Sequence, residues 1–392
     1  MRRIAFISSG YLPLPSVKGG AVETLIDMLV ESDKINTKYK LDVYSIYDKE
    51  AIKESKKRKN THYFYIKNEN KLKKAIRYIV NHIGNIYIGN DFISSIIRNY
   101  KDKLKEYDYV IIENKPEFGL LLRKYVKGKL YFHSHNDFLN KNTKRALKIY
   151  DVYDQIFCLS KYICNRVQEI NLNDNSNKVK LLYNGVDIDK FTNVSPSIVL
   201  EMKKKYNIAD NDKVFMYSGR IVKEKGVKEL ILAFNKLHGE KLKLLVTGGV
   251  GYGNNTKDKY FEEIYNLSKK NNNIIFTGYI DYKNMPIIYN MVDYGIVPSI
   301  WEEPFALTVV EHLASGHPVI ITKSGAMPEL VNNSCALIAD KDEIVNNLKE
   351  DMIIIQNMKF RSNDCVKAAL KFSKENYLNT FLKLMEEEDE SK

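Results

Sequence analysis

Two hydrophobic patterns alternate along this chain. Short, continuous apolar runs predict buried strands, and segments with apolar residues at every third or fourth position predict amphipathic helices. One such helical face, after the first run, consists of Val22, Ile26, Leu29 and Val30. The runs that we interpret as strands are Ile4–Ser9, Leu41–Ile46, Tyr109–Glu113, Leu130–His133, Gln155–Leu159 and Lys180–Tyr183. Strands that alternate with helices in this way indicate a doubly wound parallel sheet.

The alternation stops at a polar stretch, residues 184–211, and then restarts. A second helical face consists of Val227, Leu230, Ile231, Phe234 and Leu237. The strands expected around it are Val214–Ser218, Leu242–Thr247, Ile274–Thr277, Tyr294–Pro298 and Val319–Thr322. A length of 392 residues also favours two domains. We therefore predict an α/β chain with two Rossmann-like domains, residues 1–188 and 189–364, that face a central cleft. In the last segment, 365–392, a helix at about Cys365–Met385 is expected to return to the first domain.

Two carboxylates eight positions apart, Glu303 and Glu311, bracket the start of a very apolar helical segment. Pro304 suits its first position, and Gly316 and Pro318 supply a stop signal. A helix N-terminus beside a cleft favours an anion. A carboxylate next to such a site would repel the anion and must therefore have a different role, such as accepting hydrogen bonds from sugar hydroxyls. Taken alone, the spacing is more typical of a helix-capping Glu303 and a solvated Glu311.

Ligands of open parallel sheets bind where the strands end, so we examined the residues that follow them. Arg220 and Lys225 follow the strand Val214–Ser218 and lie next to glycines, including Gly219. Two cations at a strand end can neutralise a diphosphate without a metal, although a basic surface loop has the same composition. The glycine-rich loop 247–253 matches neither dinucleotide nor P-loop motifs, which disfavours a dehydrogenase.

In the first half, two neighbouring strands end in polar residues. Glu113 and Asn114 end one of them, and His133, His135 and Asn136 end the next. We expect these side chains to form hydrogen bonds with a polar ligand. The histidine spacing also suits zinc, but the sequence shows no third ligand nearby, so no metal site is predicted.

Two further loops were considered for phosphate or metal binding. Gly20 directly precedes a predicted helix, which makes that loop a second candidate for a phosphate-facing helix start. The acidic pairs Asp187/Asp189 and Asp340/Asp342 resemble metal-binding DxD motifs. The first lies in the polar connection and the second in a polar loop, and chance matches are expected at this acid content. We therefore assign no metal to them.

The net charge of +12 is unevenly distributed. Residues 1–190 hold 35 Lys and Arg against 22 Asp and Glu, and residues 191–392 hold 26 against 27. Residues 53–83 combine basic clusters with an amphipathic stretch at 71–83, which suits an anionic membrane surface but also an ordinary helix with a solvated basic face. No nucleic-acid-binding motif accompanies the charge. The four cysteines form no CxxC pair and fit a reducing, cytoplasmic setting.

Taken together, these residues resemble the family 4 retaining glycosyltransferases of the GT-B fold. The most specific match is the E-x7-E motif, Glu303–Glu311, with Gly316–Ile320 after it. The similarity is greatest to bacterial cell-surface polysaccharide and spore-coat glycosyltransferases. Further matching segments are Lys18-Gly19-Gly20, His133-Ser134-His135-Asn136, Tyr183–Asp187, Ser218-Gly219-Arg220, Lys225-Gly226 and Val297-Pro298-Ser299.

The resemblance implies roles for individual residues. Arg220 and Lys225, with Gly219 beside them, would hold the donor diphosphate. Glu303 would contact the donor sugar, and Glu311 the ribose hydroxyls. The backbone N–H groups implied near the donor are those of Phe305, Ala306, Leu307 and Thr308.

The first domain would complete the site. The backbone of Gly20 would face the diphosphate, and His135 would lie near the reaction centre, with His133 as the competing candidate. Glu113, Asn114, His133 and Asn136 are assigned to the acceptor side. The expected catalytic residues are His135, Glu303, Arg220 and Lys225.

The resemblance thus implies a metal-independent, cofactor-free enzyme that transfers a sugar, with retained configuration, from a nucleotide-diphosphate donor. UDP is the expected nucleotide, and the acceptor would be a glycan or a polyprenyl-diphosphate-linked glycan in surface polysaccharide biosynthesis. The enzyme would be cytoplasmic or peripheral on the inner membrane face. A nucleotide-sugar epimerase and a non-catalytic partner subunit are the alternatives. The family often has Gly where Ala306 stands, which leaves the donor sugar open.

Overall fold

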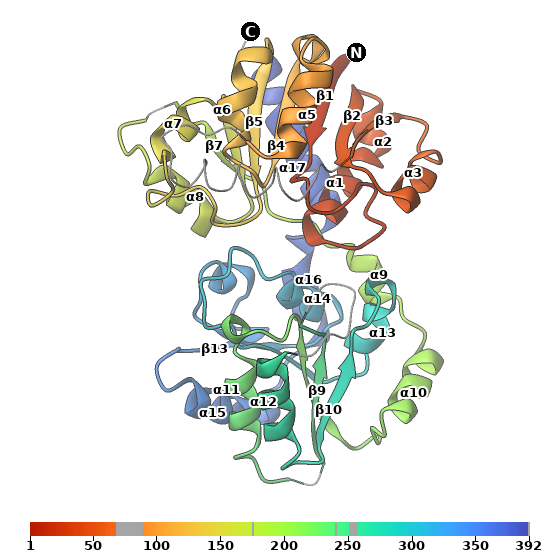
Figure 1. Ribbon diagram of the computed structural model, residues 1–392. Helices are drawn as coiled ribbons and strands as arrows, with labels where there is room; N and C mark the ends of the chain where they lie inside the picture. Colours follow the sequence, from red (N-terminus) through yellow and green to blue (C-terminus); the bar gives the residue numbers. More distant parts are fainter. Residues whose placement is uncertain (68–88, 175, 240, 251–257, 391–392) are drawn as a thin grey trace. The chain divides into compact units, whose positions relative to one another are not determined.

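The computed structural model describes residues 1–67, 89–174, 176–239, 241–250 and 258–390. By its contacts the chain forms two compact units (Figure 1). The first consists of Met1–Tyr183 and Tyr377–Lys392, and the second of Asn184–Asn376. The boundaries between the units thus fall at 183/184 and 376/377, whereas the sequence analysis placed them at 188/189 and 364/365. Each unit contains one parallel sheet of its own, as predicted.

In the first unit the strands pair in the order β3-β2-β1-β4-β5-β6-β7, and all pairs are parallel. The direction of the order reverses between β1 and β4, which confirms the doubly wound topology. The edge strand β3 was not predicted, because its central residues are only half-buried and its hydrophobic pattern is weak. The strands are β1 (Arg2–Ile7), β2 (Tyr39–Ile46), β3 (Thr61–Ile66), β4 (Tyr109–Glu113), β5 (Lys129–Ser134), β6 (Gln155–Cys158) and β7 (Val179–Leu181).

The terminal helix α17 (Lys374–Glu390) completes the core of the first unit. Its Phe381 is fully buried, and the ring centroid lies 6.3 Å from that of Phe6 on β1. The predicted return of the terminal helix is therefore confirmed. The other helices of this unit are α1 (Ala21–Val30), α2 (Asp33–Asn36), α3 (Lys49–Ser55), α5 (Asp91–Tyr100), α6 (Phe118–Leu122), α7 (Ala146–Asp151) and α8 (Lys161–Gln168).

The prediction of one continuous helix at Cys365–Met385 was wrong. The structure has two helices there, α16 (Ser362–Leu370) and α17, separated by residues 371–373. At the break, the N–H of Val186 donates to the carbonyl of Phe372 at 2.8 Å, and the N–H of Lys374 donates to Val186 at 2.8 Å. This strand-like bridge takes up backbone groups that a continuous helix would use internally.

In the second unit the parallel order is β10-β9-β8-β11-β12-β13. The strands are β8 (Lys213–Ser218), β9 (Leu242–Thr247), β10 (Ile274–Gly278), β11 (Tyr294–Val297), β12 (Val319–Thr322) and β13 (Ala336–Ala339), of which β13 was not predicted. Its helices are α9 (Ile188–Thr192), α10 (Pro196–Lys205), α11 (Val227–Phe234), α12 (Lys259–Ser268), α13 (Met285–Tyr289), α14 (Leu307–Ala314), α15 (Ile344–Asn357) and α16.

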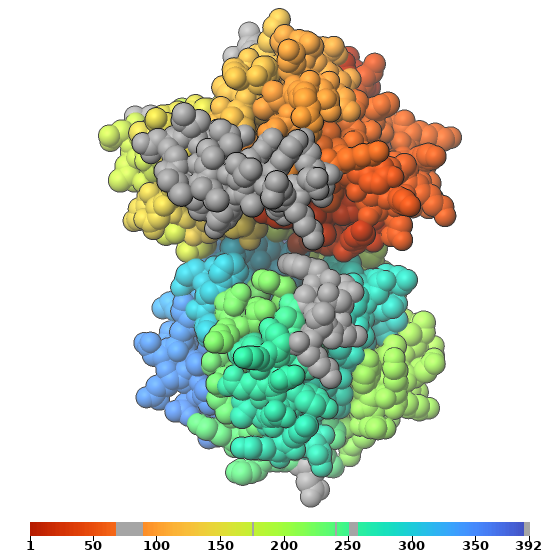
Figure 2. Space-filling model, viewed as in Figure 1, coloured from red at the N-terminus to blue at the C-terminus, as the bar shows by residue number. Residues whose placement is uncertain are grey.

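The polar stretch 184–211 contains α9 and α10 and belongs to the second unit. None of the residues of α10 is buried. Figure 2 shows this helix, in yellow-green, on the surface of the second unit. We interpreted this polar stretch as a connection between the domains. Its polar composition instead reflects α10, a helix on the surface of the second unit.

The helix between the two carboxylates begins later than predicted. It is α14, whose first residue is Leu307, and Pro304 precedes it in a loop. The loop is held by its backbone, because the Glu303 carbonyl accepts a hydrogen bond from the N–H of Ala326 at 2.8 Å. The predicted end is confirmed, since Gly316 follows the helix at a positive φ of 81°.

The predicted membrane-facing stretch lies only partly within the described residues. Residues 68–83, which include the whole amphipathic segment 71–83, lie outside them. Of the upstream basic cluster, Arg58 is half-buried, and its guanidinium is paired with Asp27 at 2.6 Å and with Glu31 at 2.5 Å. None of the described helices combines the length and apolarity needed to cross a bilayer.

Candidate functional site

The structure brings Lys225 and Glu303 into direct contact. Lys225 Nζ lies 2.5 Å from Glu303 Oε1, and Ser299 Oγ donates to the same oxygen at 2.5 Å. Glu303 is 3% exposed, so its carboxylate is held by these two donors inside the second unit. The Lys225 ammonium also lies over the Trp301 ring, 5.4 Å from its centroid. The cation predicted for the diphosphate and the carboxylate predicted for the sugar therefore share one site.

A close approach of two loops produces this contact. Gly226 follows Lys225 with a positive φ of 69° and is the N-cap residue of α11. A Cβ atom at this position would lie 1.9 Å from the carbonyl oxygen of Pro298, which directly follows β11. Only glycine permits both this φ value and this distance. The loop after β8 is thereby brought against the end of β11, next to Ser299.

The Gly219–Arg220 segment is fixed mainly through its backbone. The hydroxyl of Tyr217 donates to the Arg220 carbonyl at 2.5 Å, and the Gly219 N–H donates to Thr247 at 3.0 Å. Gly248 packs so tightly that a Cβ atom there would lie 1.9 Å from the Gly219 carbonyl oxygen. The side chain of Arg220 is half-buried at the carboxyl end of β8, where the prediction placed it.

Glu311 lies in the second turn of α14 and is 4% exposed. Two tyrosine hydroxyls donate to it: Tyr289, on α13, to Oε2 at 2.6 Å, and Tyr282 to Oε1 at 3.0 Å. Burial raises the pKa of Glu311, and these two hydrogen bonds lower it in part. Sequence reasoning missed both tyrosines. Each carboxylate oxygen can accept a further hydrogen bond, so the predicted contact with ribose hydroxyls is compatible with them.

The N-terminus of α14 has no side-chain cap, because its N-cap residue is Ala306. The first backbone N–H groups of a helix have no partner inside it, so those of Leu307 and Thr308 belong to this uncapped end. Ala306 and Phe305 are buried in the loop between Glu303 and the helix. The arrangement can offer N–H donors to an anion, as the resemblance implied.

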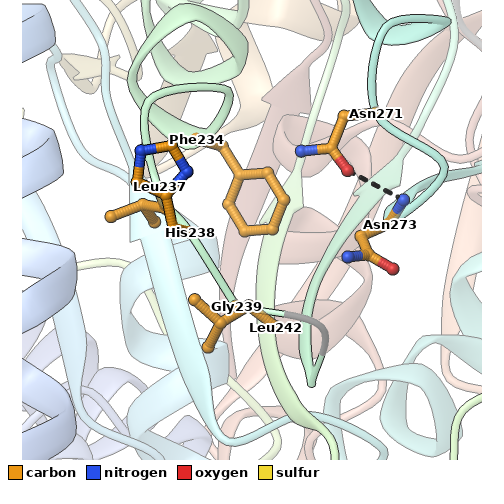
Figure 3. Close-up of a pocket in the computed structure, with 7 residues that line it drawn as sticks. All are labelled: Phe234, Leu237, His238, Gly239, Leu242, Asn271 and Asn273. Carbon is orange, nitrogen blue, oxygen red and sulfur yellow. Dashed lines mark hydrogen bonds between the residues drawn. The ribbon is translucent and has the colours of Figure 1, made fainter.

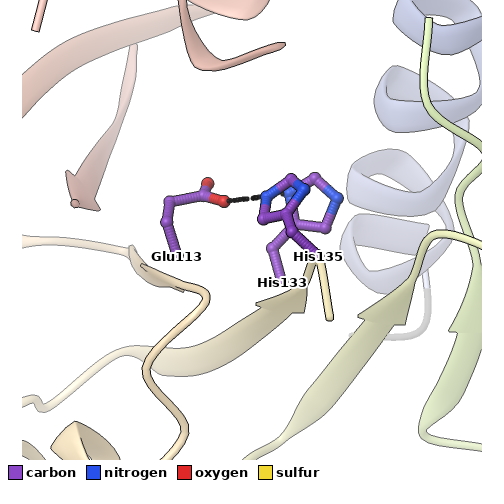
Figure 4. A group of neighbouring side chains, drawn as sticks. All are labelled: Glu113, His133 and His135. Atoms are coloured by element: carbon purple, nitrogen blue, oxygen red, sulfur yellow. Dashed lines mark hydrogen bonds and ion pairs between the residues drawn. The ribbon is translucent and has the colours of Figure 1, made fainter. Parts of the chain in front are cut away.

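In the first unit the structure brings together Glu113, His133 and His135 (Figure 4). Glu113 ends β4 and pairs in register with His133 on β5, and His135 follows β5 by one residue. His135 Nε2 lies 2.7 Å from Glu113 Oε2, and His133 Nδ1 lies 3.1 Å from the same oxygen. All three are buried. Glu113 is therefore the third potential metal ligand that the sequence analysis did not find. It was missed because it lies on the preceding strand, separated from the histidines by the connection through α6.

The two predicted asparagines support this cluster. Asn114 has a positive φ of 57°, and its Oδ1 accepts a hydrogen bond from the His135 N–H at 3.3 Å. The backbone carbonyl of Asn136 accepts a hydrogen bond from Ser134 Oγ at 2.8 Å. Asn114 thus orients the loop that carries His135, and Asn136 closes that loop.

Gly20, with a φ of 107°, is the N-cap residue of α1. Glu23, in the first turn of this helix, was not singled out by the sequence analysis. It is 4% exposed, and a Cβ atom at Gly20 would lie 2.2 Å from its Oε2. Burial raises the pKa of Glu23 to about 7, and the charge of Glu113 adds to the shift. The signal that could have identified it is an acid three residues after the N-cap residue, Gly20.

A separate hollow of about 270 Å³ lies in the second unit (Figure 3). Phe234 at the end of α11, Leu242 at the start of β9 and Asn273 just before β10 contribute to its lining. It therefore opens at the amino ends of the strands. Because ligands of this architecture bind at the carboxyl ends, we do not connect the hollow with the site.

The chain is similar in sequence to several known proteins. Residues 199–372, all within the second unit, match the model of the family described as glycosyl transferases group 1. Spore coat protein SA of Bacillus subtilis is 25% identical over 340 residues, which cover 84% of this chain and 83% of that protein. The lipopolysaccharide 1,2-N-acetylglucosaminetransferase of Salmonella typhimurium is 26% identical over 245 residues, 61% of each chain.

The fold of the whole chain also has solved counterparts. The crystal structure of HepE from Anabaena in complex with UDP-glucose matches 99% of this chain and 100% of its own, with a TM-score of 0.73. At 17% sequence identity, this match shows a shared fold.

Proposed function

We propose that this chain is a retaining glycosyltransferase that moves a sugar from a UDP-sugar to a glycan or lipid-linked glycan acceptor. The observation that carries the proposal is the contact of Lys225 with Glu303. It lies inside the segment that matches the glycosyltransferase family model. A cation for a diphosphate and a carboxylate for sugar hydroxyls are the two groups that donor recognition requires at one place.

The proposed chemistry depends on charge. When the bond between the sugar and the diphosphate breaks, negative charge develops on the leaving oxygen. Lys225, Arg220 and the uncapped start of α14 would stabilise that charge, and fixed donors of this kind each contribute a few kcal/mol. The acceptor hydroxyl would attack the sugar carbon from the face that the diphosphate leaves, and it would give its proton to the diphosphate. Because the new bond forms on the face where the old one breaks, the configuration is retained. Because side chains supply the positive charge, we propose that no metal is required.

Two comparisons motivate the substrates. HepE is a protein of the same fold that binds UDP-glucose. The Salmonella relative is named for a transfer of N-acetylglucosamine to lipopolysaccharide. These two proteins support a role in surface polysaccharide biosynthesis. The excess of basic residues before residue 190 supports peripheral binding at the inner membrane face. Salt-sensitive co-sedimentation with anionic vesicles would be expected, and its absence would remove the membrane part of the proposal.

The central test is transfer from a panel of UDP-sugars, with and without glycan acceptors, in wild type and Lys225→Ala. We expect kcat to fall about 100-fold in the variant, as for the loss of one stabilising donor. Lys223→Ala is the matched control, because Lys223 is an exposed lysine of the same loop. Equal rates in Lys225→Ala and wild type would contradict the proposal. Conversion of the donor without any acceptor would instead indicate an epimerase.

A further inference from the structure

Three side chains gather at the carboxyl edge of the first sheet: Tyr11, Lys115 and Phe138. Each follows a different strand, Tyr11 after β1, Lys115 after β4 and Phe138 after β5. These strands are neighbours, because β4 pairs with both β1 and β5. The order of the strands reverses between β1 and β4. Open parallel sheets bind their ligands at such a reversal, so the three residues stand where a ligand is expected.

One ammonium group connects the three residues. Lys115 Nζ lies 4.6 Å from the ring centroid of Tyr11 and 5.7 Å from that of Phe138. It also donates a hydrogen bond to the Tyr11 hydroxyl at 3.1 Å. In the described part of the chain, no carboxylate forms an ion pair with Lys115. Neutral groups therefore hold this charge in place, and it can still attract an anion.

Both rings are exposed, Tyr11 by 70% and Phe138 by 47%. A single exposed apolar side chain is ordinary on a protein surface. Two aromatic rings that share one cation at a ligand-binding edge are less ordinary, because a ligand that covers them would bury a large apolar area. A sugar ring suits this surface. One face of a pyranose carries C–H groups that can pack on an aromatic ring, while its hydroxyl groups stay in water.

The loop that carries Phe138 is held in place by its own contacts. Thr143 Oγ1 donates a hydrogen bond to the Phe138 carbonyl at 3.0 Å. The neighbouring acid, Asp137, is paired with Arg166 at 2.8 Å, so its charge is compensated. The ring thus has its position before a ligand arrives, which lowers the entropic cost of binding.

We propose that Tyr11, Lys115 and Phe138 form a binding subsite for a sugar ring that carries a negatively charged group. The rings cover the C–H face of the sugar, and Lys115 binds the charged substituent. That this sugar belongs to the acceptor rests on the proposed function, in which the groups for the donor diphosphate lie on the second unit. Lys115 directly follows Asn114, which the sequence analysis assigned to the acceptor side. The phosphate of a lipid-linked sugar and the carboxylate of a uronic acid share this chemistry.

The first experiment measures binding and needs no turnover. Saturation-transfer difference NMR of the full chain, with excess UDP to fill the proposed donor site, gives the Kd values of glucose 1-phosphate, glucuronate and glucose. Both charged sugars should bind about 2- to 5-fold more tightly than glucose, the gain that one partly exposed charge contact supplies. The tighter of the two identifies a phosphate or a uronic acid. Equal binding of all three sugars would overturn the proposal, as would inorganic phosphate that binds as tightly as glucose 1-phosphate.

Variants separate the contribution of the charge from that of the rings. Lys115→Met should remove the preference for charged sugars. Tyr11→Ser should weaken the binding of all three sugars about 2- to 10-fold, whereas Tyr11→Phe keeps the ring and should retain most of the binding. Lys124→Met is the matched control, because Lys124 Nζ lies 4.9 Å from the Tyr125 ring centroid but precedes β5, at the amino edge of the sheet. Equal effects of Lys115→Met and Lys124→Met would contradict the proposal. Circular dichroism confirms that each variant is folded.

A contact with another protein is the competing explanation for the exposed rings. Analytical ultracentrifugation of wild type and Tyr11→Ser tests it. If the sedimentation coefficient changed while the binding of the three sugars did not, the rings would belong to a protein interface and the proposal would be wrong.

Transfer assays separate this inference from the proposed function. If wild type bound the charged sugars as expected but moved no sugar from any UDP-sugar to a polyprenyl-diphosphate-linked sugar, the proposed function would fail and the subsite would stand. Where transfer occurs, Lys115→Met should raise the KM for that acceptor about 2- to 5-fold and leave the KM for the UDP-sugar unchanged. An unchanged acceptor KM would overturn the assignment of the subsite to the acceptor.

Discussion

Lys225 donates a hydrogen bond to Glu303 at 2.5 Å, and each of these residues compensates the charge of the other. The pair is largely removed from water, since the side chains are 21% and 4% exposed. Breaking such a pair from one side leaves an uncompensated charge behind. The proposed donor site and the stability of the second unit are therefore connected through one contact.

The first prediction follows from this contact. Lys225→Met and Glu303→Gln should each destabilise the protein, and the double variant should be more stable than the sum of the single losses predicts. We expect a coupling of about 0.5–3 kcal/mol, the usual range for residues in direct contact. Urea denaturation of the four proteins measures it. Additive effects would mean that the ion pair does not exist in solution.

Gly226 provides a second prediction. Gly226→Ala combines a positive φ of 69° with a Cβ atom 1.9 Å from the Pro298 carbonyl oxygen. Gly19→Ala is the matched control, because Gly19 has a φ of 72° and nothing within 4 Å of the added atom. The control should lose about 1–2 kcal/mol from the φ value alone. Gly226→Ala should lose clearly more in the same denaturation assay, and equal losses would contradict the close approach of the two loops.

The two tyrosines on Glu311 should behave differently. Tyr289 is fully buried, so Tyr289→Phe leaves a buried carboxylate short of one donor and should cost about 1–3 kcal/mol of stability. Tyr282 is 45% exposed as a residue, and Tyr282→Phe removes a hydrogen bond that is only partly buried. That variant should be nearly as stable as wild type but should change the KM for the UDP-sugar. The prediction is wrong if Tyr282→Phe is the less stable of the two in thermal denaturation.

Glu23 should produce a pH dependence of stability. Burial raises its pKa from 4.5 to about 7, so the folded state binds the proton more tightly than the unfolded state. The resulting stabilisation is fully present below pH 4.5 and is lost as the pH rises to about 7. Its full size is at most about 3 kcal/mol.

Glu23→Gln tests this prediction. The neutral amide cannot titrate, so the variant should gain stability relative to wild type as the pH rises from 5 to 8. Urea denaturation at several pH values gives the difference between the two proteins, in which the contributions of other titrating groups cancel. A difference that is constant with pH would show that Glu23 is not protonated in the folded state.

Much of the fold could be predicted from the sequence, because buried parallel strands and amphipathic helices leave strong local patterns. The apolar runs at β1, β4, β8 and β11 are examples. The weak edge strands β3 and β13 were missed, since half-exposed strands lack that pattern. The start of α14 was misplaced because the backbone contact between Glu303 and Ala326, 23 residues apart, has no local signal.

By itself the sequence determined the residue types at the strand ends, and with them the candidates Arg220, Lys225, Glu303 and His135. Only the tertiary structure decided which of these meet. Glu113 reaches the two histidines because β4 and β5 pair in one register, and Lys225 reaches Glu303 because Gly226 lets two loops approach. Hydrophobic periodicity is a property of neighbouring residues along the chain. Contacts across a sheet depend on register and loop packing, and neither is expressed in any short stretch of sequence.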